Sequence, residues 1–419
     1  MNIDTVRFSH LLEVNELNDL NYFLSHTAFI ISHKSESLET LLSVLWYLPV
    51  NSPIIIVTNC PEEERQTIEQ GLKERLAQHK NTYLVHQKDE LVASLLGERG
   101  VSQILGDDGR VVNGKGEGIY IGTMCAAQLG YAEWVIYYDA DNFVPSALLE
   151  YTMAMSKLFM AARSGRSYAE DAVILNECHQ QEHVIPDLHN IRICWSSKPE
   201  LGNARQDVKP VGADYLGETR TKSVGSLNST LLGRCTRVVS PLFTSLLDGW
   251  FGIREYPVIS SNAGEQGMTM QTAKTMRFSS GYSVETFQFL DLLYHASRWQ
   301  GEPKSATLQQ YQSKSPHFHD KKDDSHIKKM IADSLGAFLL FEKFLPRNVK
   351  KHLKEVYQEH NLEVCYPKVY PSVAELHLEQ YGAFTEYYRL FRVKEVYTEP
   401  VPVVGDSPFA DEEVSCGLL

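Results

Sequence analysis

The sequence predicts an α/β fold, with a mostly parallel sheet, helices on both of its faces and a helical C-terminal part. Three observations support this prediction. Short apolar runs alternate with segments of helical spacing from residue 25 onward. These runs are too short for helices and are typical of strands buried in a parallel sheet. From residue 288 the spacing becomes largely helical.

The expected elements follow a regular order in the first part of the chain. Strands are expected at 28–31, 54–59 and 82–86, and helices at 38–45 and 62–76. In the first of these helices, leucines recur every three or four positions and form one apolar face. Because each strand is followed by a helix before the next strand, the strands are expected to run parallel.

A second group of elements continues the pattern. A helix is expected at 118–129 and a strand at 134–138, which runs directly into an acidic motif. Another strand is expected at 191–195, after a polar excursion. The last expected helices cover 323–344 and 346–359.

The expected organisation has four parts. They are an N-terminal extension (1–24), an α/β core (25–287), a mainly helical region (288–393) that completes the site with the His317–His319 loop, and a flexible acidic tail (394–419).

Charge and cysteine usage exclude several classes of protein. The chain has 53 acidic and 40 basic residues, a net charge of -13, which argues against a nucleic acid as its main partner. The seven cysteines are widely spaced, so neither a disulfide framework nor a zinc ribbon is expected. Residues 1–24 do not resemble a secretory leader, and no uncharged apolar stretch is long enough for a membrane span. We therefore expect a cytoplasmic protein.

The acidic motif Asp139–Asn142 is the first candidate for chemistry. In an extended segment the carboxylates of Asp139 and Asp141 project to the same side and can approach one divalent cation. Ligands of open α/β sheets gather at the carboxyl ends of strands, which is where this motif falls. The alternative is a turn in which an aspartate caps the backbone, because D-x-D also occurs by chance.

A glycine-rich segment, Asn113–Gly118, is the second candidate. Its glycines allow a ligand to approach the backbone closely, and Lys115 at the start of a helix favours an anion. The spacing fits neither a Walker A nor a dinucleotide-binding motif. A plain flexible loop is the alternative.

Three further segments carry polar side chains suited to a ligand. Asn262 and Glu265 lie in a segment that is expected to enter a helix, and each can bond a sugar hydroxyl; a capped helix entry with no substrate contact is the alternative. In an extended Pro316–Lys321 segment, two histidines face the same way, so that one reaches a metal; a surface pair is the alternative. Residues His86–Asp89 end a strand with groups that can hold a nucleoside, although a solvated strand end explains them equally well.

Seven motifs in one order resemble the mannosyl-3-phosphoglycerate synthase family. They are Pro53–Asn59, His86–Asp89, Gly114–Gly118, Asp139–Asn142, Asn262–Glu265, Phe278–Ser283 and Pro316–His319. Two departures concern Ser32–Glu36, where the family has Pro-x-Lys/Arg-Asn-Glu, and Gln266, which replaces a more common histidine. The joint match is specific, and it implies a nucleotide-sugar transferase fold of the GT-A type.

The resemblance assigns roles position by position. The metal site is implied at Asp139, Asp141 and His319. Donor binding is implied at Lys34, Glu36, Gln87, Lys88, Asp139, Ala140 and Asp141. Acceptor binding is implied at Gly114, Lys115, Gly116, Glu117, Arg192 and Asn262. The catalytic candidates are Asp139, Asp141 and Glu265.

The implied activity is transfer of mannose from GDP-mannose to 3-phosphoglycerate with retention of configuration. The implied cofactor is Mg²⁺ or Mn²⁺, with Co²⁺ or Zn²⁺ as alternatives, and the implied partners are a second copy of the chain and a downstream phosphatase. Front-face substitution is the preferred mechanism, and a covalent route through Glu265 competes with it. The alternative functions are a glucosyl-3-phosphoglycerate synthase, a sugar-phosphate nucleotidylyltransferase and a non-catalytic binding protein.

Overall fold

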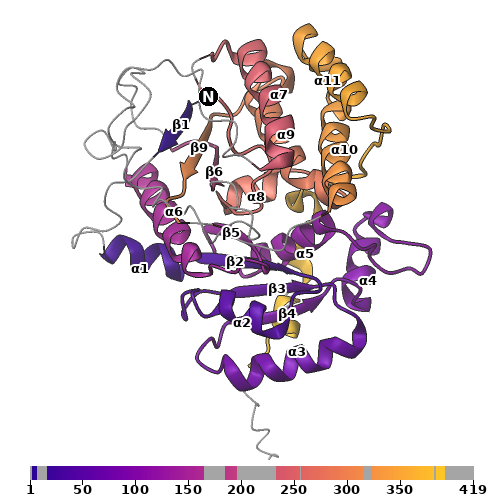
Figure 1. The fold of residues 1–419 in the computed structure, drawn as a ribbon. Coiled ribbons are helices and arrows are strands. Elements are labelled where there is room, and N and C mark those ends of the chain that lie inside the picture. The colour runs from indigo at the N-terminus through magenta and orange to yellow at the C-terminus, as the bar shows by residue number, and fades with distance from the viewer. Residues whose placement is uncertain are drawn as a thin grey trace, which may run out of the picture.

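The computed structural model of the chain describes residues 2–6, 17–164, 185–195, 233–254, 256–315, 317, 323–381 and 384–391. It is built around one eight-stranded sheet with the order β1-β9-β6-β7-β5-β2-β3-β4 (Figure 1). The strands are β1 (Asn2–Val6), β2 (Thr27–His33), β3 (Ile54–Thr58), β4 (Thr82–His86), β5 (Trp134–Asp139), β6 (Leu188–Cys194), β7 (Gln266–Thr269) and β9 (Ala306–Gln312). In the sheet as described, every pairing is parallel except those of β7 with β5 and β6.

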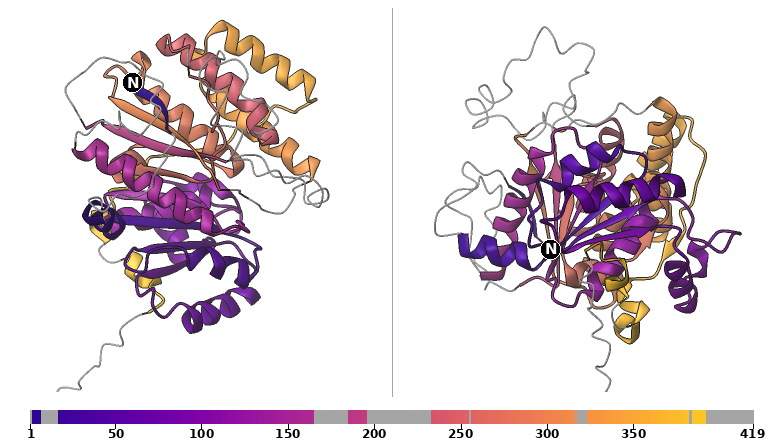
Figure 2. Two further views of the ribbon diagram at one scale, coloured as in Figure 1. Left: turned by 60° about the vertical axis from the view of Figure 1, so that its left-hand side comes forward. Right: turned by 90° about the horizontal axis from the view of Figure 1, so that it is seen from below.

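Helices cover both faces of the sheet (Figure 2). One face packs against α1 (Leu17–Ser25), α2 (Leu38–Leu45), α3 (Glu62–Arg75) and α6 (Ser146–Ser164). The other packs against α4 (Glu90–Glu98), α5 (Lys115–Gln128) and α8 (Met270–Thr275). Alternate residues of β3 point to opposite faces, Ile54 and Ile56 to the first and Ile55 and Val57 to the second. Burial on both faces explains why this strand is apolar throughout.

A third core lies beside the β9–β6 half of the sheet. It is formed by α7 (Arg234–Phe251), α9 (Val284–Ala296), α10 (Asp324–Leu340) and α11 (Arg347–Glu359), which lie together in Figure 1. A small antiparallel pair, β8 (Phe278–Ser279) and β10 (Val369–Tyr370), ties this region to α5. The predicted fold class is confirmed.

Two local predictions are wrong. The helix expected from residue 118 begins at Lys115, so most of the glycine-rich segment is the first turn of α5 and not a loop. Its glycines allow close packing, because a Cβ on Gly116 would lie 1.9 Å from the carbonyl oxygen of Ser279. The segment after Glu265 is expected to enter a helix directly, but Gln266–Thr269 forms β7 first. The local spacing of this short segment suggests a helix. Because the segment lies between β5 and β6, its backbone hydrogen-bonding groups pair with these two strands instead.

Residues 388–390 lie against β4, which is an edge strand of the sheet. The amide of Leu390 donates to the carbonyl of Thr82 in β4 at 2.9 Å, and Tyr388 donates its hydroxyl to Asp89 at 2.8 Å. This segment covers part of an edge strand that would otherwise expose its backbone. The four-part division of the chain stays a prediction. Within the described part of the chain, no helix is both long enough and apolar enough for a membrane crossing.

Candidate active site

The predicted functional side chains converge at one edge of the sheet. Asp139 ends β5 and lies opposite Ser32 of β2, which ends at His33. Trp195 follows the parallel strand β6. Because β7 runs antiparallel, Glu265 at its beginning reaches the same edge. The carboxyl ends of several strands therefore meet at one edge, which is where ligands of open α/β sheets bind.

An ion-pair network connects β5, α5 and α9. The Nζ atom of Lys115 lies 2.7 Å from Oδ2 of Asp139 and 2.6 Å from Oε1 of Glu285. Burial works against the charge on Lys115, but the two carboxylates outweigh it and raise the pKa of the lysine well above its ordinary value. The ammonium therefore stays charged inside the site. Lys115 is the first residue of α5, so the positive end of the helix adds to its field.

Glu265 is a buried carboxyl with a strongly perturbed pKa. Its side chain is only 2% exposed, and Oε2 accepts a hydrogen bond from Nε1 of Trp195 at 2.9 Å. Burial, followed by the charge of Asp139, raises its pKa to about 8; Asp141 adds to the rise, while Trp195 and Lys115 oppose it. Glu265 therefore shares an electrostatic environment with both aspartates of the D-x-D motif, as expected for one site.

His317 belongs to the same cluster. It is 2% exposed, its Nε2 lies 3.7 Å from Oε1 of Glu265, and its ring stacks on Trp195 with centroids 4.4 Å apart. Its Nδ1 lies 3.3 Å from Nδ2 of the fully buried Asn142. A surface position is therefore excluded for His317. His319, the histidine assigned to the metal, lies outside the described residues.

Glu150 of α6 was missed by sequence reasoning. Its carboxylate accepts hydrogen bonds from the hydroxyl of Tyr311 and from the backbone amides of Lys314 and Ser315, all between 2.7 and 2.8 Å. These bonds fix the loop that leads from β9 to His317. The available signal was an acidic residue among the apolar positions of a buried helix, which is rare without a partner.

Most groups predicted to bind the acceptor are used within the protein. The carboxylate of Glu117 accepts from the hydroxyl of Tyr370 at 2.6 Å and from the amide of Gly281 at 3.1 Å. The Glu117 side chain is 1% exposed, and these hydrogen bonds connect the first turn of α5 to the loop after β8. A Cβ on Gly114 would lie 1.9 Å from Oε2 of this glutamate. A larger residue at position 114 would therefore displace this carboxylate from Tyr370 and Gly281.

Arg192 and Asn262 do not present free groups to a ligand either. The guanidinium of Arg192 is fully buried and donates to the carbonyls of Ser260, Ser261 and Glu285 and to the side chain of Gln266. The amide nitrogen of Asn262 donates to Thr286 and Ser334. Both side chains instead hold the segment before Glu265 against the start of α9. The predicted direct contact of Arg192 with the acceptor does not fit this geometry, because its donors are spent in the interior.

The side chains predicted for the donor lie at the adjacent strand ends. The carboxylate of Glu36 accepts from the backbone amide of Lys34 at 2.7 Å. Gln87 is buried and donates to the carbonyl of Val112 at 2.6 Å, while Nζ of Lys88 lies 3.6 Å from Asp108. The registers of β2, β3 and β4 bring these ends side by side. Ala140 is also buried, and with Asp141 it forms a turn instead of the extended segment expected for the D-x-D motif. The backbone amide of Val144 donates to Oδ1 of Asn142 at 2.9 Å and closes this turn.

The donor set at β5 suits a hard divalent cation. Asp139 and Asp141 supply carboxylate oxygens, the ligands that Mg²⁺ and Mn²⁺ prefer. Within the ranges that the structure describes, no group of three or more His, Cys, Asp and Glu residues could hold a metal. The third ligand assigned from the resemblance, His319, falls outside those ranges. The Lys115 ammonium lies against Asp139, so a divalent cation at this carboxylate would compete with it.

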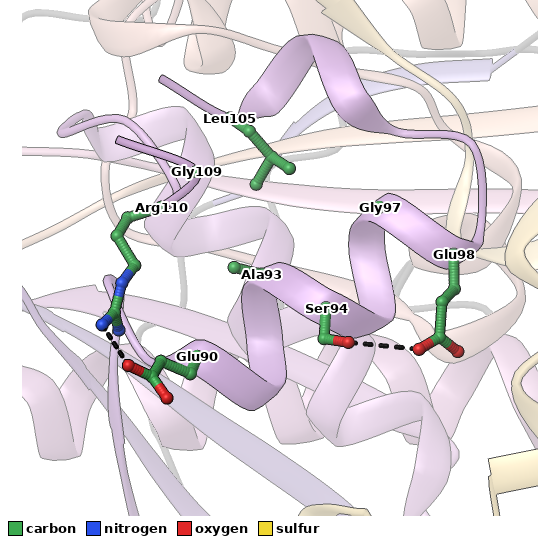
Figure 3. A pocket seen from close by; sticks show the side chains of 8 residues that line it. All are labelled: Glu90, Ala93, Ser94, Gly97, Glu98, Leu105, Gly109 and Arg110. Carbon is green, nitrogen blue, oxygen red and sulfur yellow. Dashed lines mark hydrogen bonds and ion pairs between the residues drawn. The ribbon is translucent and has the colours of Figure 1, made fainter. Parts of the chain in front are cut away.

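A surface groove of about 510 Å³ lies beside Lys88, whose carbonyl accepts from the lining residue Arg110 at 2.9 Å (Figure 3). It is lined by Glu90, Ala93, Ser94, Gly97, Glu98, Leu105, Gly109 and Arg110. Its two carboxylates have partners along the groove, Glu90 with Arg110 and Glu98 with Ser94. The groove contains none of the predicted site residues, and it is not the predicted site.

We expect the metal-free protein to lose stability through Glu265 as the pH rises. The pKa of Glu265 is raised from 4.5 to about 8, so between these values the folded state binds a proton that the unfolded state has released. This contribution is fully present below about pH 4.5 and is lost as the pH rises through about 8, with a slope of up to about 1.4 kcal/mol per pH unit. Urea unfolding in EDTA across this range, for wild type and Glu265→Gln, measures it. Equal slopes for the two proteins would contradict the prediction.

The mostly parallel sheet and the D-x-D carboxylates at its carboxyl edge define a class of enzyme, the nucleotide-sugar glycosyltransferases. A family model described as mannosyl-3-phosphoglycerate synthase matches residues 3–213 and 219–384. The chain belongs to the mannosyl-3-phosphoglycerate synthase family. The resemblance stated from the motifs is thereby confirmed.

Two relatives and one solved structure are similar to the chain over most of its length. A mannosyl-3-phosphoglycerate synthase from Pyrococcus furiosus is 28% identical over 350 residues, which cover 81% of this chain and 77% of the relative. One from Aeropyrum pernix is 28% identical over 335 residues, 77% of this chain and 74% of the relative. A solved structure of glucosyl-3-phosphoglycerate synthase from Mycobacterium tuberculosis, in complex with Mn²⁺, UDP and phosphoglyceric acid, has a TM-score of 0.45 and 14% identity, covering 81% of this chain and 86% of that chain.

Proposed function

We propose that the protein transfers mannose from GDP-mannose to 3-phosphoglycerate with retention of configuration, which gives mannosyl-3-phosphoglycerate and GDP. The observation that carries the proposal is the position of Asp139 and Asp141 at the end of β5, with the Lys115 ammonium 2.7 Å from Asp139. Family membership supports the choice of sugar and acceptor. We further propose a cytoplasmic location, a homodimer and a downstream phosphatase.

Asp139, Asp141 and His319 are the residues that would hold a divalent cation, Mg²⁺ or Mn²⁺. When bound, such a cation neutralises the charge that develops on a departing nucleoside diphosphate. Donor binding falls to the strand ends, with Lys34, Glu36, Gln87 and Lys88 on the nucleoside side. Ala140 and Asp141 form a turn directly after β5, so Asp141 stays next to the end of the strand.

The acceptor is assigned to the start of α5. Lys115 supplies a charged ammonium as the first residue of α5, and the first amides of a helix, which have no intrahelical acceptors, favour an anion. Gly114, Gly116 and Glu117 shape this turn by packing against the segment after β8. We assign Arg192 and Asn262 to positioning, because they hold the Glu265 segment and the start of α9.

Front-face substitution is the mechanism that this arrangement favours. The acceptor hydroxyl forms the new bond to the anomeric carbon, the bond to the GDP oxygen breaks on the same side, and the hydroxyl proton passes to that oxygen. The raised pKa of Glu265 leaves its carboxyl protonated at neutral pH in the metal-free protein, and a protonated carboxyl is a poor nucleophile. Positioning and charge neutralisation then supply most of the rate.

The test is an assay of products. We expect GDP and a mannosylated phosphoglycerate when the protein is incubated with GDP-mannose, 3-phosphoglycerate and Mg²⁺ or Mn²⁺, with the anomeric configuration read by NMR. Release of inorganic diphosphate instead of GDP would identify a nucleotidylyltransferase. Turnover with UDP-glucose but not with GDP-mannose would identify a glucosyl-3-phosphoglycerate synthase. A mannosyl adduct trapped on Glu265 would replace the front-face mechanism with a covalent one.

A further inference from the structure

We infer that the Lys115 ammonium occupies the metal site when no metal is bound, and that Glu285 holds the ammonium there. When a divalent metal binds Asp139, the ammonium turns from Asp139 to an anionic ligand. Metal binding and phosphoglycerate binding are then positively coupled through one ammonium group. The inference rests on the proposed function and adds to it a role for Glu285 and an order of binding.

The geometry places a single ammonium between two carboxylates. Nζ of Lys115 lies 2.7 Å from Asp139 and 2.6 Å from Glu285, distances typical of charge-assisted hydrogen bonds. An ammonium has three donors, and these two carboxylates take two of them, so among the described residues one donor is left for a further acceptor. A Cβ on Gly264 would lie 2.6 Å from Oδ2 of Asp139 and 3.0 Å from Nζ of Lys115. The backbone at Gly264 therefore closes directly over the pair.

The two carboxylates differ in how firmly they are held. The side chain of Glu285 is 6% exposed and that of Asp139 is 28% exposed. Glu285 is the second residue of α9, where its backbone carbonyl accepts from buried Arg192 at 3.2 Å. The next residue, Thr286, accepts from Asn262 at 3.0 Å. Glu285 is thus an anchored partner, whereas Asp139 faces the more open side of the network, where a metal and its ligands would enter.

Coulombic repulsion supplies the coupling. A divalent cation on Asp139 would lie within a few ångströms of a second positive charge in a partly buried site, where such repulsion is strong. Lys115 then gains from turning its ammonium to an anion, and an anion already bound there removes part of the repulsion that opposes the metal. Two ligands that each relieve the same unfavourable contact bind with positive cooperativity.

Glu285 sets the strength of this effect, because it competes with Asp139 for Lys115. Removing the charge of Lys115 removes the cation that competes with the metal for Asp139. Removing the charge of Glu285 leaves Asp139 as the lysine's charged partner and strengthens the competition. The two substitutions should therefore change metal affinity in opposite directions, whereas a merely structural role for both residues would weaken metal binding in each variant.

The experiment measures free Mn²⁺ by electron paramagnetic resonance during titration of the full-length protein, with and without 3-phosphoglycerate. For wild type we expect 3-phosphoglycerate to tighten Mn²⁺ binding several-fold. For Lys115→Met we expect Mn²⁺ alone to bind about tenfold more tightly and the effect of 3-phosphoglycerate to disappear. For Glu285→Gln we expect weaker binding of Mn²⁺ alone. Lys73→Met, which removes an exposed lysine of α3, is the matched control and should bind Mn²⁺ as wild type does.

The outcomes separate this inference from the proposed function. Mn²⁺ binding to wild type with no gain in Lys115→Met, or with the same direction of change in both variants, would overturn the inference and leave the metal-dependent transferase in place. Absence of Mn²⁺ binding to wild type, with and without GDP-mannose, would remove the metal from the proposed function and the inference with it. Circular dichroism and thermal unfolding confirm that each variant is folded, and the Glu285→Gln titration decides the matter if Lys115→Met is not.

Discussion

Replacing Asp141 by asparagine is expected to lower mannosyl transfer by about a thousandfold or more while the fold is retained. The side chain shares the electrostatic environment of Glu265 and Asp139, and it lies in the turn directly after the buried strand β5. Asparagine keeps the size of the side chain but offers the cation a neutral oxygen in place of a carboxylate. The departing diphosphate would lose the charge neutralisation that we assign to this motif.

The measurement is the rate of GDP release at saturating GDP-mannose and 3-phosphoglycerate, together with thermal unfolding of the same preparation. Asp248→Asn is a suitable control, since it removes a surface carboxylate of α7 that pairs with Arg254 at 2.8 Å. That variant should keep the wild-type rate. Full activity in Asp141→Asn would refute the assignment of the D-x-D motif, whatever the fate of the other site residues.

Much of the fold was predictable because its signals are local. Near residues 28, 54, 82 and 134 the sequence has short apolar runs that are typical of buried strands. The structure places β2, β3, β4 and β5 there. The D-x-D carboxylates were found for the same reason, since their meaning depends on the strand immediately before them. The metal, donor and acceptor assignments stay predictions, although their strand ends do meet at one edge.

The missed features depend on contacts between distant parts of the chain. Glu285 pairs with a lysine on α5, and Glu150 holds a loop that follows β9. Neither sits in a motif that spacing can reveal. The error about Gln266–Thr269 has a related cause, because a four-residue segment becomes a strand only when two neighbouring strands offer it partners. Tertiary pairing overrides local spacing in such a segment.

The same distinction explains why Arg192 was assigned to a ligand. The resemblance implied an acceptor contact for Arg192, but a resemblance between sequences does not show whether a side chain faces a ligand or the protein interior. In the fold its guanidinium lies 4.9 Å from the ring centroid of Phe289 and is enclosed by four acceptors. Burial lowers its pKa to about 10, with Glu285 opposing the shift, so it remains charged at neutral pH.

Arg192→Met is therefore expected to destabilise the protein by about 3–5 kcal/mol, because a buried ion is lost and its acceptors are left without donors. The carbonyls of Ser260, Ser261 and Glu285 are all affected, so the segment before Glu265 and the start of α9 should loosen together. Urea unfolding measures the change, and Arg254→Met, on the surface, should shift stability by less than about 0.5 kcal/mol.

If Arg192 bound phosphoglycerate directly, the variant would instead keep its stability and raise the KM for 3-phosphoglycerate. A positioning role predicts the reverse, a loss of stability with a fall in kcat, because the network that holds Glu285 and Lys115 would no longer be fixed.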